Sequence, residues 1–290
     1  MMVRIFLIII RIIWSVGMIG MIKVVYPHPI FDWLTYLAAF VIFDTRVWQQ
    51  LGQLFGNILT KIRYGSKLPS KENYVCKANY ILPFKGKWTV YNGGVDKETS
   101  HWWGNVSMRY AYDFIITDDR PHTCVGDNKS VYSYLAYGVD IIAPADGVVV
   151  KVSKKHKNSR VDGKKGYSDT WSLTGNVIVI KHADREYSLI AHLAPNSIVV
   201  NIGDSVKQGD IIAKCGHTGN SLEPHIHFQL QSGKGLFTSV GLPIAFSNIS
   251  VEQKKNYDTI DKRPHINNLQ PIGDKFYIGR GLDVENKIDL

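Results

Sequence analysis

Two histidines stand one residue apart at the end of the run Gly216-His217-Thr218-Gly219-Asn220-Ser221-Leu222-Glu223-Pro224-His225-Ile226-His227-Phe228. The residues after Pro224 are mostly apolar and strand-like, and successive side chains of a strand point to opposite faces. We therefore expect His225 and His227 on one face, about 6 to 7 Å apart along the strand. Two imidazoles in this arrangement suit a shared metal site, where one ligates the ion and the other acts beside it as an acid, a base or an oxyanion donor. The alternative is a pair of unrelated surface histidines.

The sequence around this run predicts a β domain. From about residue 80 onward, short runs of β-branched and aromatic residues alternate with glycine-containing turns, and no long helical period interrupts them. We expect a mainly β sandwich or barrel-like domain over residues 79–250, followed by a polar C-terminal extension over 251–290 with Tyr277-Ile278 as its possible strand. The clearest strand candidates are 147–152, 176–181, 187–193, 211–214 and 225–231.

The N-terminal residues predict a membrane anchor helix, which we assign to residues 1–28. Residues 5–26 are almost wholly apolar, broken by Arg11 and Lys23, and about 20 apolar residues span a bilayer. The segment has no small-residue cleavage site, which favours an uncleaved anchor. Arg4 and Arg11 would hold the N-terminus in the cytoplasm. The predicted location is therefore membrane-anchored, with the β domain outside the cytoplasm in the cell envelope.

A second apolar run, residues 33–43, is short for a membrane span. Thr45 can cap a helix after this run, because apolar residues follow it at helical spacing. We expect residues 29–78 to form a helical segment close to the membrane. If the second run crosses the membrane instead, the orientation of everything after it is inverted.

Composition restricts the class of partner. The 290-residue chain carries a formal net charge of +9, which favours anionic partners such as cell-wall polymers or anionic lipids. Its basic residues are scattered, and no dense basic run contains interleaved aromatic residues, so we expect no nucleic-acid partner.

The three cysteines include no C-x-x-C pair, which leaves either one disulfide and one thiol or three thiols: Cys76, Cys124 and Cys215.

Other residues can complete a metal site with the histidine pair. Hydrolytic zinc sites combine three protein ligands with an open position for water. His192 ends a strand candidate, and Asp113 lies in the strand-like run Arg109-Tyr110-Ala111-Tyr112-Asp113-Phe114-Ile115-Ile116, where an unpaired carboxylate is unfavourable. Taken alone, Asp113 could instead pair with Arg109, and His192 could be a structural histidine.

In their order and spacing these residues resemble the lysostaphin-type zinc metallopeptidases, which cleave peptide cross-bridges or stem peptides of bacterial peptidoglycan. The resemblance covers roughly residues 84–246 and includes the runs 143–149, 175–180, 191–193, 206–213 and 219–228. It implies a β-sheet groove, the duplicated hybrid motif, with zinc at its floor. It also implies that Asp113 and His227 ligate the zinc, and that His192 and His225 are catalytic residues flanking the attacking water and the scissile carbonyl.

The chain departs from this family at the first ligand. The family ordinarily has a histidine four residues before the aspartate, and here that position is Arg109, whose protonated guanidinium does not ligate zinc. The best substitute is His101, 12 residues before Asp113. A branch of the family with an R-Y-A-x-D-F signature and a histidine upstream at about this distance has a similar layout. His122 is a second candidate.

The predicted function is that of a zinc-dependent endopeptidase acting on peptidoglycan or another peptide. Two alternatives stay open. Because of Arg109, the chain could be a degenerate member without zinc that acts as a scaffold or an activator of cell-wall enzymes. Residues 203–213 also resemble a half-motif of biotinyl and lipoyl carrier domains, although no convincing lysine stands at a hairpin tip.

Overall fold

The computed structural model describes residues 19–22, 24–34, 45–65, 67–161, 172–263 and 269–287. The chain divides into two compact units, Met1–Leu54 and Phe55–Leu290. In the first unit, residues 19–22, 24–25 and 30–34 are helical. The amphipathic helix α3 (Thr45–Tyr64) begins in the first unit at the expected residue, Thr45, and continues into the second.

Within the described part of the chain, no helix is both long enough and apolar enough to cross a membrane. Most of the predicted anchor, residues 1–18, lies outside the described residues. Residues 35–43, most of the second apolar run, also lie outside them. The membrane anchor and the location that follows from it therefore stay predictions.

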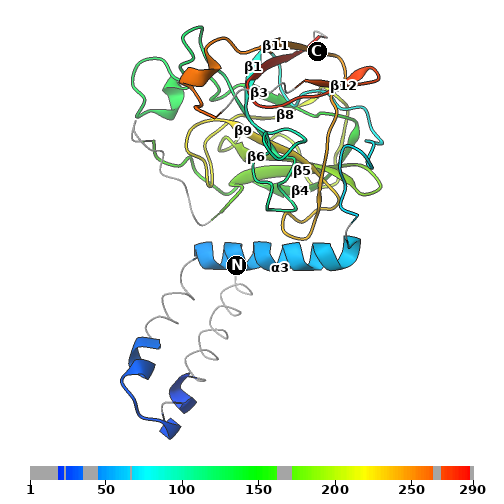
Figure 1. Ribbon diagram of the computed structural model, residues 1–290. Coiled ribbons are helices and arrows are strands. Elements are labelled where there is room, and N and C mark those ends of the chain that lie inside the picture. Colours follow the sequence, from blue (N-terminus) through cyan, green and yellow to red (C-terminus); the bar gives the residue numbers. More distant parts are fainter. Residues whose placement is uncertain are drawn as a thin grey trace. The chain divides into compact units, whose positions relative to one another are not determined.

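The second unit is built on an antiparallel sheet with the strand order β11-β14-β1-β2-β9-β6-β5-β4-β7, in which β10 also pairs with β9 (Figure 1). Two small sheets, β3-β8 and β12-β13, accompany it. The strands are β1 (Trp88–Asn92), β2 (Tyr112–Ile115), β3 (Asp140–Ile142), β4 (Gly147–Ser153), β5 (Asn176–Ala183), β6 (Glu186–Leu193), β7 (Ser205–Val206), β8 (Ile211–Lys214), β9 (Ile226–Gln231), β10 (Gly241–Leu242), β11 (Ile249–Gln253), β12 (Gln270–Ile272), β13 (Lys275–Tyr277) and β14 (Leu282–Asn286).

The predicted β class and its clearest strands are confirmed, since β4, β5, β6, β8 and β9 lie within two residues of the expected bounds. The end of the chain differs from the expectation. The possible last strand at Tyr277 is β13, and β14 follows it and lies between β11 and β1 in the main sheet. The sheet thus continues past residue 250. In β14, Leu282 and Val284 are buried, whereas Asp283 and Glu285 are partly exposed. So short an alternation gives only a weak signal for a strand in the sequence.

The alternation along the central strands separates an apolar core from a polar face. On β9, Ile226, Phe228 and Leu230 belong to the large core, together with Tyr112 and Phe114 of β2. The residues between them, Asp113 on β2 and His227 on β9, must then point to the opposite face. The same packing that buries the aromatic side chains therefore presents a carboxylate and an imidazole side by side.

The three cysteines are free thiols in the described structure, which removes the alternative of one disulfide.

Candidate metal centre

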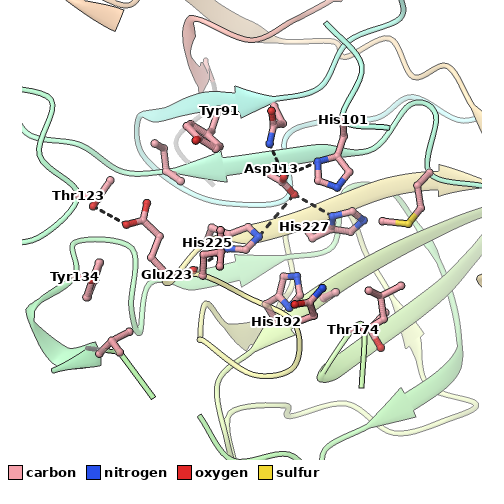
Figure 2. A pocket seen from close by; sticks show the side chains of 18 of the residues that line it. Tyr91, His101, Asp113, Thr123, Tyr134, Thr174, His192, Glu223, His225 and His227 are labelled. Carbon is pink, nitrogen blue, oxygen red and sulfur yellow. Dashed lines mark hydrogen bonds and ion pairs between the residues drawn. The ribbon is translucent and has the colours of Figure 1, made fainter. Parts of the chain in front are cut away.

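Asp113 and His227 are direct partners in the register of β2 and β9. His227 Nδ1 lies 3.0 Å from Asp113 Oδ1, and both side chains are buried (Figure 2). Burial alone would raise the pKa of Asp113, but the imidazoles of His101, His227 and His225 hold that pKa well below its usual value. The carboxylate is therefore ionised and faces imidazole nitrogens that can share a cation with it.

His101 reaches the same carboxylate from the connection between β1 and β2. Its Nδ1 lies 2.8 Å from Asp113 Oδ2, but this buried nitrogen has no partner in hydrogen-bond geometry. Asp113 raises the pKa of His101, so the site favours positive charge at this point. Donor atoms of His101, Asp113 and His227 lie within 4.8 Å of one another. Two imidazoles and a carboxylate form a donor set that zinc accepts.

Gln229 determines which nitrogen of His227 carries the hydrogen. The Gln229 side-chain NH2 donates to the Ser107 carbonyl at 3.1 Å and to Gln231 Oε1 at 2.6 Å, which leaves Gln229 Oε1 facing His227 Nε2 at 3.1 Å. An oxygen only accepts, so His227 Nε2 carries the hydrogen and Nδ1 keeps its lone pair. In the neutral imidazole that lone pair faces the carboxylate oxygen of Asp113 at 3.0 Å, a contact that becomes favourable when the two atoms share a cation, either a proton on Nδ1 or a metal ion. The residues present thus fit a metal ion.

Arg109, which stands where the family has its first ligand, lies away from this cluster. Its guanidinium stacks over the Trp103 ring, 4.7 Å from the centroid, and its Nε donates to the Trp103 carbonyl at 3.2 Å. The Arg109 carbonyl in turn accepts from Ser100 Oγ at 2.6 Å. Arg109 therefore holds the residues on both sides of His101. The alternative ion pair between Arg109 and Asp113 does not form.

His122, the second candidate for the missing ligand, does not reach the site. Its exposed side chain lies 3.5 Å from Asp118 in the loop after β2, and its backbone N–H donates to the same carboxylate. The structure therefore brings His101, and not His122, to Asp113 and His227.

His192 and His225 lie beside the donor set, with ring centroids 4.7 Å apart (Figure 2). His192 Nδ1 donates to the Thr218 carbonyl at 2.8 Å, and His225 Nδ1 donates to the Glu223 carbonyl at 2.8 Å. A carbonyl only accepts, so each Nε2 carries a lone pair. Burial is the main cause that lowers both pKa values, well below the usual range for His192. Both imidazoles are therefore neutral near pH 7 and can accept a proton.

The backbone at His192 has an unusual conformation that aims this side chain. His192 has φ of 63°, in the left-handed region that residues other than glycine seldom adopt. The backbone N–H of His192 donates to the Thr174 carbonyl, and next to it Gly175 packs against Thr218 so closely that a Cβ on Gly175 would lie 2.3 Å from the Thr218 carbonyl carbon. This contact fixes the carbonyl that accepts from His192. Non-glycine residues with positive φ are enriched at functional sites.

The cluster lies in a cleft of about 890 Å³. Glu223 forms part of the wall, where Thr123 Oγ1 donates to its carboxylate at 3.0 Å (Figure 2). Burial raises the pKa of Glu223. Apolar and aromatic side chains complete the lining, including Tyr91, Trp102, Leu173 and Leu222.

Whereas His122 lies outside the cleft, the structure brings together five of the residues singled out from the sequence: His101, Asp113, His192, His225 and His227. Their roles as ligands and catalytic groups stay predictions. Sequence reasoning missed Gln229, although its place two residues after His227 in the same strand puts it on the same face.

Comparison with known proteins identifies the domain. Residues 127–238 match the model of peptidase family M23. An uncharacterized metalloprotease of Haemophilus influenzae is 28% identical over 140 residues, which is 48% of this chain and 25% of that protein. The DD-carboxypeptidase/endopeptidase Mpg of Neisseria meningitidis is 33% identical over 92 residues, 32% of this chain and 19% of that protein. The chain thus spans a quarter or less of the length of these relatives.

Solved structures of the family are also similar. The catalytic domain of lysostaphin from Staphylococcus simulans is 22% identical, with a TM-score of 0.32 over 54% of this chain and 88% of that one. The catalytic domain of the M23 protein EnpA from Enterococcus faecalis is 19% identical, with a TM-score of 0.36 over 56% and 93%. On the family match and the sequence relatives, the chain contains a domain of peptidase family M23, the lysostaphin-type family that its motifs resemble.

Proposed function

We propose that this chain is a zinc-dependent endopeptidase that hydrolyses peptide bonds in peptidoglycan. The observation that carries the proposal is the arrangement of two imidazole nitrogens around the carboxylate of Asp113. With Nε2–H facing Gln229, the Nδ1 of a neutral His227 directs its lone pair at the ionised Asp113 at 3.0 Å, and His101 Nδ1 lies 2.8 Å from the other carboxylate oxygen. A carboxylate and two imidazoles that converge in this way form a donor set that can hold a zinc ion.

In this proposal, His101, Asp113 and His227 hold the zinc. Bound zinc supplies Lewis-acid chemistry, since it polarises a carbonyl and lowers the pKa of water toward neutrality. Asp113 and His227 are buried and His101 is partly buried, and the low dielectric around them strengthens their interaction with a cation.

The two neutral imidazoles would move the proton. The lone pair on His225 Nε2 lies 3.7 Å from Asp113 Oδ1, so a water between the donor set and this nitrogen is within reach of a base. His225 or His192 would take the proton from the attacking water and later pass it to the leaving amine. The imidazolium formed in between would donate to the oxyanion that develops on the substrate carbonyl.

The substrate class rests on the relatives and on charge. The named relatives include a DD-carboxypeptidase/endopeptidase and a cell division protein, DipM of Caulobacter vibrioides, which is 35% identical over 74 residues, 25% of this chain and 12% of that protein. The net charge of +9 suits an anionic wall polymer. A cleft lined by apolar walls and a few polar groups suits an extended peptide.

We also propose that the domain works at a membrane, with its catalytic side in the cell envelope. The apolar run of residues 5–26 is one support. The second is that the described part of α3 leaves large apolar side chains exposed, among them Phe55, Ile58, Leu59 and Ile62. An amphipathic helix with such a face is suited to lie in the membrane interface.

A second candidate is favoured by one observation, the arginine at the position of the usual first ligand. A protein without zinc could keep the same cleft and serve as a scaffold or activator of wall enzymes. The zinc content of the purified chain, measured by elemental mass spectrometry, separates the two candidates. One zinc per chain together with release of peptides from purified peptidoglycan supports the enzyme, and a chain without zinc that still binds peptidoglycan supports the scaffold.

Single substitutions test the assignment of roles. Asp113→Ala and His227→Ala are expected to lose the zinc, whereas His225→Ala is expected to keep zinc and lose turnover, because His225 contributes a base rather than a ligand. His122→Ala serves as the matched control, since this exposed histidine lies outside the cleft. Stoichiometric zinc in the His227→Ala protein would contradict the proposed ligand set.

A further inference from the structure

Asn92 joins the candidate ligand Asp113 to a residue from the C-terminal region. Its side-chain NH2 donates to Asp113 Oδ2 at 3.0 Å, and its Oδ1 accepts from the guanidinium of Arg263 at 2.6 Å. Asn92 ends β1, and the register of β1 with β2 shifts between Val90 and Asn92. This bulge inserts one extra residue and places Asn92 directly opposite Asp113.

The charges on its two sides fix the orientation of the Asn92 amide. The reverse orientation would place the amide oxygen against the carboxylate and the NH2 against the guanidinium, so both contacts would become repulsive. Arg263 can only donate and an ionised Asp113 can only accept. The guanidinium of Arg263 therefore determines that the NH2 of Asn92 points at the metal ligand.

Arg263 is itself held in place. Its Nε donates to Asp261 Oδ2 at 2.6 Å, and its backbone N–H donates to Asp261 Oδ1 at 3.0 Å. Asp261 also accepts from the Tyr257 hydroxyl at 3.2 Å, and that hydroxyl in turn contacts the carbonyl of Tyr91, next to Asn92. The planar guanidinium can make these contacts together because its donors form a rigid fork.

We infer that Arg263 is a positioning residue for Asp113, acting through Asn92. This inference rests on the proposed metal site. By donating to Oδ2, Asn92 fixes the rotation of the carboxylate and leaves Oδ1 directed at His227 Nδ1. Hydrogen bonds of this kind orient metal ligands, and their loss typically lowers metal affinity about 10- to 100-fold.

The sign of the effect distinguishes positioning from simple electrostatics. Arg263 is a cation close enough to the site to disfavour the charged form of His101. By charge alone it would repel a zinc ion, so removal of its charge would tighten zinc binding. If Arg263 acts by orienting Asn92, its removal weakens zinc binding instead.

The test is a double-mutant cycle on zinc affinity, measured by competition with a chelator. We expect Asn92→Ala to weaken zinc binding about 10- to 100-fold and Arg263→Gln about 10-fold, with the double variant no weaker than Asn92→Ala, because Arg263 acts through Asn92. Arg185→Gln is the matched control, since this exposed arginine contacts Tyr64 outside the cleft. Thermal unfolding of the metal-free proteins checks that each variant folds.

The outcomes separate the inference from the function on which it rests. If wild type binds zinc and Arg263→Gln binds it equally well or more tightly, the positioning role is overturned and the metal site stands. If the two single effects add in the double variant, Arg263 does not act through Asn92 and the inference is also overturned. If wild type binds no zinc, both the proposed function and the inference fail.

Discussion

Gln229 and His227, two residues apart on β9, are joined by a hydrogen bond of 3.1 Å between Oε1 and Nε2. The Gln229 amide cannot turn over, because its NH2 already donates to the Ser107 carbonyl and to Gln231 Oε1. The bond therefore places a hydrogen on His227 Nε2, so that in the neutral imidazole the lone pair of Nδ1 is directed at Asp113. A neutral residue outside the proposed donor set thus influences the chemical form of one proposed ligand.

Replacing Gln229 by leucine is expected to weaken zinc binding about 10- to 100-fold, because the His227 tautomer is no longer fixed and its Nε2–H is left unpaired in a buried position. Chelator competition measures the change. Gln208→Leu is the matched control, since the amide of Gln208 donates to the carbonyls of Asn79 and Pro144 outside the cleft. Equal zinc affinity in the two variants would show that another contact sets the tautomer.

Arg109 and His101 give the second prediction. Arg109→Ala removes the stacking on Trp103 and the bond to its carbonyl, so the segment that carries His101 loosens. We expect zinc affinity to fall while Asp113 and His227 still bind the ion weakly. Arg185→Ala, which removes another arginine–aromatic contact, 5.2 Å from the Tyr64 ring, is the control. The variant Arg109→His is expected not to restore affinity, because this side chain points at Trp103 rather than at Asp113; tighter binding would contradict that geometry.

The shared face of His225 and His227 could be predicted from strand alternation, whereas the convergence of Asp113 with them, 114 residues before His227, was implied by the resemblance to the lysostaphin-type family. A strand alternates its faces, and apolar neighbours on one face force the polar residues to the other. His101 was within reach as a substitute ligand because the resemblance identified the position of the missing ligand, and an imidazole upstream in the chain can take its place. The shared strand face required spacing alone, and the complete site required the family resemblance.

Contacts that depend on three-dimensional detail could not be predicted in the same way. Asn92 faces Asp113 only because a bulge shifts the register of β1, and a bulge leaves no clear sequence pattern. Arg109 stacks on Trp103 although the sequence equally allowed an ion pair with Asp113, and solvent exposure and packing decide between such partners. Arg263 lies 171 residues after Asn92 and 150 after Asp113, and at such distances sequence periodicity carries no information.

The third prediction concerns Gly175. A Cβ at this position would lie 2.3 Å from the Thr218 carbonyl carbon, and the backbone has φ of +59°. Gly175→Ala is therefore expected to displace the carbonyl that accepts from His192 and to reduce turnover. Gly86→Ala is the control, because Gly86 also has positive φ, +74°, but its Cβ would meet nothing within 4 Å.

Urea unfolding and turnover measured on both glycine variants separate the two effects. The control is expected to lose about 1–2 kcal/mol of stability from backbone strain and to keep full turnover. Gly175→Ala is expected to lose more stability than the control and most of its turnover. Equal behaviour of the two variants would show that the close contact with Thr218 does not position His192.

The fourth prediction is a pH dependence of stability that arises from His217. This fully buried histidine contacts Ser221 Oγ through Nδ1 at 2.9 Å. Burial, assisted by the charge of His225, lowers the pKa of His217 from 6.5 to about 4. Between these pH values the unfolded chain binds more protons than the folded one, so the free energy of unfolding rises with pH in this window. The contribution, about 3 kcal/mol, is complete above pH 6.5 and is lost as the pH falls toward 4.

His217→Asn keeps a side-chain nitrogen near Ser221 but does not titrate in this range. Urea unfolding of the metal-free proteins between pH 7 and pH 4 should therefore show a smaller loss of stability in His217→Asn than in wild type, by about 3 kcal/mol. His192 and His225, whose pKa values are also lowered, remain in both proteins and contribute equally to both curves. Parallel curves for the two proteins would contradict the prediction. They would mean that His217 is protonated in the folded protein or is accessible to water there, although its side chain is fully buried.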